Sequence, residues 1–200
     1  MTEYVAPFFI GLGLAASVGF RIFLPLLVLS VASYFEIIPV NDSFHWIGTI
    51  PAMITLGVAT LIETLAYFIP WFDNLLDTIS LPTATIAGTA VMASTLIELD
   101  PLWQWALAII AGGGTAGIVK GVNANTRLAS TATTGGLANP VVTTVETAAS
   151  AGLSALSVFL WPIAAIIVIG LLIIAVFFFK NIRKFWRKPP SQDSVTPTAN

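Results

Sequence analysis

The chain has 200 residues, of which 56% are hydrophobic and only 9% are charged, whereas soluble domains carry about 25% charged residues. With a mean hydropathy of +0.91 and apolar stretches long enough to cross a bilayer, it cannot be an ordinary soluble globular protein; we expect one polytopic membrane domain. Cysteine is absent and there is one histidine, so disulfides, thiolate clusters and multi-histidine metal sites are excluded. We therefore expect no cofactor and no metal.

The basic residues are concentrated at the C-terminus. Five of the eight follow the last apolar run: Lys180, Arg183, Lys184, Arg187 and Lys188. The positive-inside rule places this segment in the cytoplasm. We expect residues 1–180 to form a single transmembrane helical domain, and residues 181–200 to form a basic, interfacial and disordered tail that binds anionic lipids.

The apolar runs predict an all-α membrane helix bundle with about six crossings. In chain order they are 6–34, 46–69, 82–98, 101–120, 140–160 and 162–180. Residues 71–79 predict a short amphipathic helix in the interface. Residues 122–139 are polar, small and nearly uncharged, and predict a re-entrant segment, so five crossings plus this segment is the alternative. Six crossings put both termini in the cytoplasm.

Arg21 is the strongest functional signal. It lies near the middle of the first apolar run, where an arginine costs about 2.5 kcal/mol or more and needs a carboxylate, carbonyls or an anionic ligand. Glu63 is the first candidate partner, because it lies deep in its own apolar run, and Glu146 is the second. The alternative role for this pair is a buried ion pair that only fixes helix packing.

A second candidate region is polar and rich in glycine. Arg127, Thr133, Thr134, Gly135 and Gly136 precede a helix start at Asn139-Pro140. Hydroxyls, glycine amides, a guanidinium and a helix N-terminus suit an anion, although no Walker-type or dinucleotide-binding spacing is present. A cytoplasmic loop that caps helices is the alternative.

The sequence contains two further patterns of this kind, an acidic pair and two glycine ridges. Asp73 and Asp77 stand at i and i+4 and are candidates for an ion or proton site, with a solvated helix face as the alternative. Glycine ridges at Gly11 and Gly19, and from Gly113 to Gly121, predict close helix contacts.

The chain resembles a bacterial integral membrane family, the domain of unknown function 4126. The resemblance rests on Gly19-Phe20-Arg21 through Leu27, on Ile69-Pro70-Trp71 through Asp77, and on Thr126-Arg127 through Val142, and it spans most of residues 10–175. It implies a membrane location and that Arg21, Asp73, Asp77, Arg127 and Gly135-Gly136 lie in shared motifs. It implies no activity.

The sequence therefore favours a small transporter or channel-like protein in the bacterial inner (cytoplasmic) membrane. Its substrate would be a small or lipid-linked anion, bound by Arg21, Glu63, Arg127, Glu146 and the Gly/Thr-rich segment. The alternative is a non-transporting membrane scaffold or assembly factor. An enzyme is disfavoured because no nucleophile–base pair or metal cluster is present. Homo-oligomers are left open, and no nucleic acid partner is expected.

Overall fold

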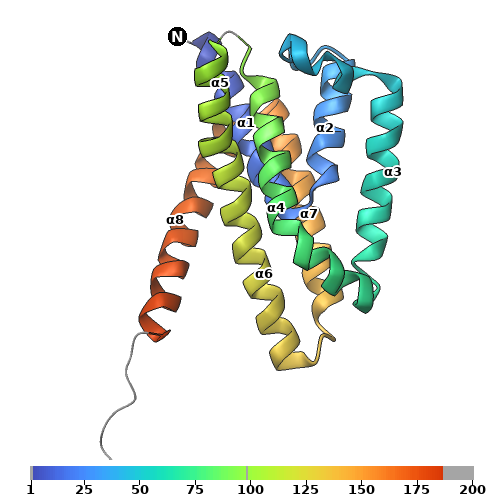
Figure 1. Ribbon diagram of the computed structural model, residues 1–200, viewed down its shortest axis with the longest axis vertical. Coiled ribbons are helices and arrows are strands. Elements are labelled where there is room, and N and C mark those ends of the chain that lie inside the picture. Colours follow the sequence, from blue (N-terminus) through green and yellow to red (C-terminus); the bar gives the residue numbers. More distant parts are fainter. Residues whose placement is uncertain (1, 98, 187–200) are drawn as a thin grey trace, which may run out of the picture.

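The computed structural model describes residues 2–97 and 99–186, with the backbone alone described at 2–4, 70–75, 77, 78 and 181–186. These residues form an all-helical bundle (Figure 1). The helices are α1 (Thr2–Phe20), α2 (Phe23–Tyr34), η1 (Asp42–Gly48), α3 (Ile50–Ala66), α4 (Pro70–Thr95), α5 (Pro101–Leu107), η2 (Ala108–Gly113), α6 (Gly114–Thr134), α7 (Asn139–Phe159) and α8 (Trp161–Trp186).

The first apolar run forms a re-entrant helical hairpin. The chain reverses at Arg21 and Ile22, inside the bundle, and α2 returns to the end at which α1 begins (Figure 1). Two contacts fix this arrangement. Gly11 of α1 packs on Thr95 at the end of α4, and the Asn41 N–H, beyond α2, donates to the Ser94 carbonyl at 2.8 Å. The expectation of one crossing over 6–34 is therefore wrong.

Two other expected segments also differ. Residues 71–79 form the first part of the continuous helix α4 rather than a separate interfacial helix. The segment 122–139 is not re-entrant, because α6 continues to Thr134 and a turn leads directly into α7. Its hydroxyls bond within the helix, as Thr126 Oγ1 does to the Val122 carbonyl at 3.0 Å, so small polar residues remain helical here.

By length and composition, three described helical stretches are suited to crossing a membrane: Pro101–Thr134, Asn139–Phe159 and Trp161–Lys180. A fourth is added if η1 and α3, bent by 67° relative to each other, count as one span. Isoleucines and leucines on the outer faces of α3 and α8, such as Leu61, Leu65, Ile166 and Ile174, are exposed, as expected for side chains that contact lipid. These observations indicate a membrane protein.

The start of α1 and the end of α8 lie at opposite ends of the bundle (Figure 1). Six full crossings would place them at the same end, so the hairpin changes the expected relation between the termini. Of the expected tail, 181–200, residues 181–186 continue α8 as helix, and residues from 187 onward lie outside the described residues.

Glycines bring the inner helices into close contact. A methyl group at Gly19 would overlap Val119 and lie 2.8 Å from the Ala116 carbonyl, and one at Gly88 would overlap Ala116 and lie 2.9 Å from the Gly112 carbonyl. Gly112 belongs to η2, a π-helical stretch between α5 and α6. Helix α1 thus packs tightly on α6, and α4 on η2, as the glycine ridges predict.

Candidate functional site

Arg21 occupies the corner of the hairpin and reaches α7. Its Nε donates to Thr147 Oγ1 at 3.0 Å, and its Nη2 donates to the Thr143 carbonyl at 3.1 Å. Its Nη2 also lies 3.7 Å from Glu146 Oε2. Thr143, Glu146 and Thr147 stand at i, i+3 and i+4 and share one face of α7. The corner of the hairpin is therefore held against α7 by a charged side chain.

Glu146 joins two arginines. Its Oε2 accepts from Arg127 Nη1 of α6 at 2.9 Å and is also the oxygen facing Arg21. Arg127 Nη1 lies 3.4 Å from Thr143 Oγ1. Arg21, Arg127 and Glu146 are all buried, and in a medium of low polarity such close, opposite charges interact far more strongly than in water.

Tyr67, immediately after α3, lies among three cations. The guanidinium carbons of Arg21 and Arg127 lie 4.0 and 4.7 Å from its ring centroid, and Lys120 Nζ lies 5.4 Å away. Lys120 Nζ also donates to Tyr67 Oη at 3.2 Å. Only 1% of Arg21 and 2% of both Lys120 and Arg127 is exposed. We call Arg21, Lys120, Arg127 and Tyr67 the cation cluster; the aromatic face offers these charges a favourable surface.

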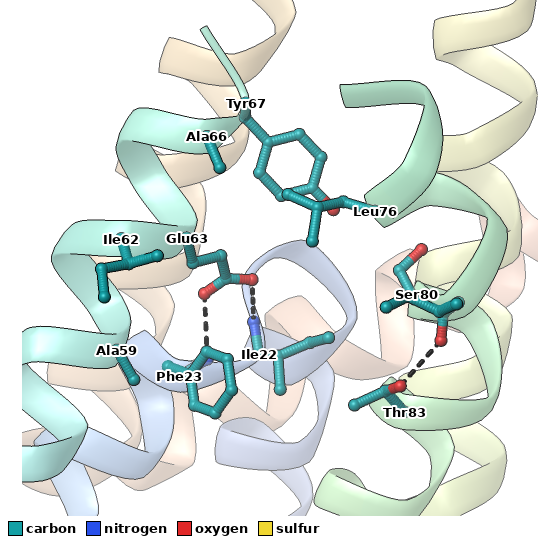
Figure 2. A pocket seen from close by; sticks show the side chains of 11 residues that line it. Ile22, Phe23, Ala59, Ile62, Glu63, Ala66, Tyr67, Leu76, Ser80 and Thr83 are labelled. Carbon is teal, nitrogen blue, oxygen red and sulfur yellow. Dashed lines mark hydrogen bonds between the residues drawn. The ribbon is translucent and has the colours of Figure 1, made fainter. Parts of the chain in front are cut away.

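Glu63 has a different role from the one expected. Its two oxygens accept the backbone N–H groups of Ile22 and Phe23, at 2.8 and 3.0 Å (Figure 2). It therefore caps the N-terminus of α2, where free N–H groups and the positive end of the helix dipole favour a carboxylate. No side-chain cap from α2's own N-cap residue, Ile22, is present. The first expected partner of Arg21 binds the next two residues of the chain instead.

The end of α1 is capped from two other helices. Asn123 Nδ2 of α6 donates to the Gly19 carbonyl at 3.2 Å, and Ser150 Oγ of α7 donates to the Ser17 carbonyl at 3.0 Å. The backbone groups on both sides of the break between α1 and α2 thus have hydrogen-bond partners from other helices of the bundle. That arrangement makes a reversal of the backbone tolerable inside a membrane.

An apolar crevice lies beside this break (Figure 2). Its volume is about 340 Å³. Its lining residues come from the hairpin corner, α3 and α4: Ile22, Phe23, Ala59, Ile62, Glu63, Ala66, Tyr67, Leu76, Ile79, Ser80 and Thr83. Tyr67 and Glu63 therefore belong both to the crevice and to the neighbourhood of Arg21. We call it the α3–α4 crevice.

The structure brings together Arg21, Glu63, Arg127 and Glu146 from the expected site, but not the glycine-rich part. Thr133 and Thr134 bond to carbonyls of their own helix, at Ala129 and Ser130. Gly135 and Gly136 have positive φ and end α6, a frequent use of glycine. Thr133 and Thr134 thus form the exposed end of α6, and Gly135 and Gly136 begin the turn that leads to α7. The side chains of Asp73 and Asp77 lie outside the described residues.

Lys120, at the end of the expected crossing 101–120, was not among the expected site residues. The sequence spacing could have identified it, because Lys120, Asn123 and Arg127 stand at i, i+3 and i+7 and share a face if the helix continues past Lys120. Thr143 and Thr147 likewise flank Glu146 on α7 at helical spacing.

The chemistry available is that of charge and hydrogen bonding. Within the described residues, no group of three or more histidine, cysteine or acidic side chains suited to a metal ion occurs. Buried guanidinium and ammonium groups around an aromatic ring can bind an anion that reaches them.

Comparison with known proteins agrees with the resemblance. No curated protein and no solved structure matches the chain. The family model described as "Domain of unknown function (DUF4126)" matches residues 8–181. The chain therefore belongs to this family of unknown function, and its candidate site is the buried cation cluster at the corner of a re-entrant hairpin.

Proposed function

We propose that this protein is a small membrane transporter or channel-like protein for a small or lipid-linked anion. The observation that carries the proposal is the gathering of Arg21, Lys120 and Arg127 around Tyr67 at the break between α1 and α2. Broken helices with ionisable residues inside the membrane are the usual construction of substrate sites in transporters.

The positions of the charges support an anion rather than a cation. Three basic side chains, from the hairpin and from α6, converge on one ring, and each is almost entirely buried. Burial of charge on this scale is expensive and is generally retained where a pathway or binding site needs it. An anion entering between these side chains would gain from all three.

A second candidate function is a non-transporting scaffold or assembly factor. It is favoured by the number of contacts that the cluster makes with protein groups, since Arg21 binds both Thr143 and Thr147 and Arg127 binds Glu146. In that case the charges fix the hairpin against α7 and bind no substrate.

We further propose a bacterial inner (cytoplasmic) membrane location, with the end of the bundle that holds the α6–α7 turn facing the cytoplasm. The basic residues from Lys180 onward support this orientation through the positive-inside rule and through attraction to anionic lipids. Because of the hairpin, the start of α1 would then face the opposite side.

The test is movement of anions in liposomes containing the full chain. Two probes are used: radiolabelled inorganic phosphate, followed as uptake, and a fluorescent dodecyl phosphate, followed by quenching of the outer leaflet with dithionite. We expect protein-dependent movement of at least one probe. Lys120→Gln should abolish it, whereas Lys180→Gln, which removes an exposed charge from α8, should not. Folded protein that moves neither probe faster than empty liposomes would favour the scaffold.

A further inference from the structure

The α3–α4 crevice is a cavity of hydrocarbon character. Its walls are side chains such as Ala59, Ala66, Leu76 and Ile79. Among its polar lining groups, the Thr83 hydroxyl is turned to the Ile79 carbonyl, at 2.7 Å, and the Glu63 carboxylate is turned to the N–H groups of Ile22 and Phe23. A cavity of about 150 Å³ accommodates a benzene molecule, and this one, of about 340 Å³, has room for a segment of a single hydrocarbon chain.

The crevice opens toward the surface that faces lipid. Ile62 and Ile79, on its two walls, are 62% and 52% exposed. They continue the apolar outer face of α3, which includes Leu61 and Leu65. A chain from the surrounding bilayer therefore has an apolar entry to the crevice between Ile62 and Ile79.

One side of the crevice meets the cation cluster. The Tyr67 ring lines the crevice and also carries the three cations at 4.0, 4.7 and 5.4 Å from its centroid. Among the described residues, Arg21 Nη1 is fully buried and has no hydrogen-bond acceptor. A buried guanidinium nitrogen in this state is costly, and an incoming anionic oxygen would relieve the cost. The Tyr67 ring thus separates the apolar crevice from three cations and from the unsatisfied Arg21 Nη1 donor.

We propose that the α3–α4 crevice binds the hydrocarbon chain of a single-chain anionic amphiphile, whose phosphate-type headgroup is held at the Tyr67 side by the cation cluster. This inference rests on the proposed function and names its substrate class. The headgroup lies near the end of α3, and the chain runs toward Ala59 and Thr83. For the headgroup to contact Arg21 directly, the Tyr67 ring turns aside and so acts as the gate between crevice and cluster.

This assignment distinguishes the ligand from two simpler ones. Inorganic phosphate has no hydrocarbon chain that could fill the apolar crevice. A neutral alcohol of the same chain length has no charge that could interact with the cations. Both therefore serve as comparison ligands in the test.

The experiment is photocrosslinking of the full chain in nanodiscs. The probe is a dodecyl phosphate with a diazirine in its chain, and the matched probe is the corresponding dodecanol. We expect the phosphate to label residues of α3 and α4 at the crevice, about tenfold more than the alcohol, because the alcohol gains nothing from buried charge. Lys120→Gln should reduce this preference, and Lys120→Arg should keep it. Excess inorganic phosphate should compete weakly.

Two pairs of variants test the chain site. Ala59→Trp and Ala66→Trp fill the crevice, whereas Val58→Trp and Leu65→Trp add the same ring on the exposed face of the same helix. We expect labelling to fall about tenfold in the first pair, because an occupied cavity excludes the chain, and to stay within about twofold in the second. Equal labelling in both pairs would overturn the chain site, and equal labelling by phosphate and alcohol would overturn the headgroup assignment.

The outcomes separate this inference from transport itself. Specific crosslinking without movement of either probe in liposomes would refute transport and leave the crevice as a lipid-binding site. Uptake of inorganic phosphate without specific crosslinking would support anion transport and refute the amphiphile.

Discussion

The Glu63 carboxylate of α3 accepts the backbone N–H of Ile22 at 2.8 Å, and this contact starts the second arm of the hairpin. Without it, the N-terminus of α2 would present unsatisfied donors inside the bundle, because Ile22 has no side chain able to cap them. A residue on one helix thereby determines where another helix begins.

The first prediction concerns this cap. Glu63→Gln keeps the shape of the side chain but leaves one acceptor oxygen for two donors, at Ile22 and Phe23. We expect a loss of about 1–3 kcal/mol in the free energy of unfolding, measured by denaturation in detergent. Glu36→Gln, at an exposed carboxylate, is the control. Equal stability of the two variants would contradict the capping role.

The second prediction concerns coupling within the ion cluster. Removing either Arg127 or Glu146, which lie 2.9 Å apart, should cost about 3–5 kcal/mol, because the remaining buried charge loses its closest partner. The double variant Arg127→Gln with Glu146→Gln should cost less than the sum of the single changes. The same cycle on Arg21 and Glu63 should show weaker coupling, since Glu63 bonds mainly to backbone. A coupling energy between Arg21 and Glu63 larger than that between Arg127 and Glu146 would instead indicate a direct ion pair between Arg21 and Glu63.

How far the sequence predicted this site depends on the residue. The burial of Arg21 followed from its position in an apolar run, and the all-helical bundle followed from the runs themselves. Of the two expected partners of Arg21, the second, Glu146, forms the ion pair, at 3.7 Å. The first, Glu63, does not, because hydropathy does not reveal that the chain reverses at Arg21 and leaves two N–H groups for Glu63 to cap. Lys120 was missed because the polar residues 122–139 after it predicted a re-entrant segment, whereas the helix continues and the Thr126 hydroxyl bonds to a carbonyl of that helix.

The third prediction uses two glycines of one helical stretch. A methyl group at Gly112 would overlap Met92 and lie 2.6 Å from the Gly88 carbonyl, whereas one at Gly114 would meet nothing within 4 Å. Gly112→Ala should therefore cost about 1–3 kcal/mol by overpacking. Gly114→Ala should be neutral or stabilising by up to about 1 kcal/mol, since alanine favours helix. Thermal unfolding of both purified variants checks this, and a stable Gly112→Ala would show that α4 and η2 can separate.

The fourth prediction concerns topology. The chain has no cysteine, so Val5→Cys, His45→Cys and Leu137→Cys each introduce one thiol. A membrane-impermeant maleimide should label positions 5 and 45 from the same side, because α1 and α2 form a hairpin, and position 137 from the other side. The unmodified chain gives the background. Labelling of positions 5 and 45 from opposite sides would indicate one full crossing over 6–34.

The π-helical stretch η2 (Ala108–Gly113) has a consequence for where this chain can lose a residue. It lies upstream of Lys120 and Arg127 on the same continuous helical stretch, and such bulges hold one residue more than a regular helix does. Deleting a single residue within η2 would restore regular hydrogen bonding and would leave Lys120 and Arg127 facing Tyr67, because the bulge holds the extra residue locally. Deleting a residue from the regular helix between Gly114 and Lys120 would instead rotate Lys120 and Arg127 by about 100°, away from Tyr67. The site therefore tolerates the loss of a residue in η2 but not in the helix that follows it.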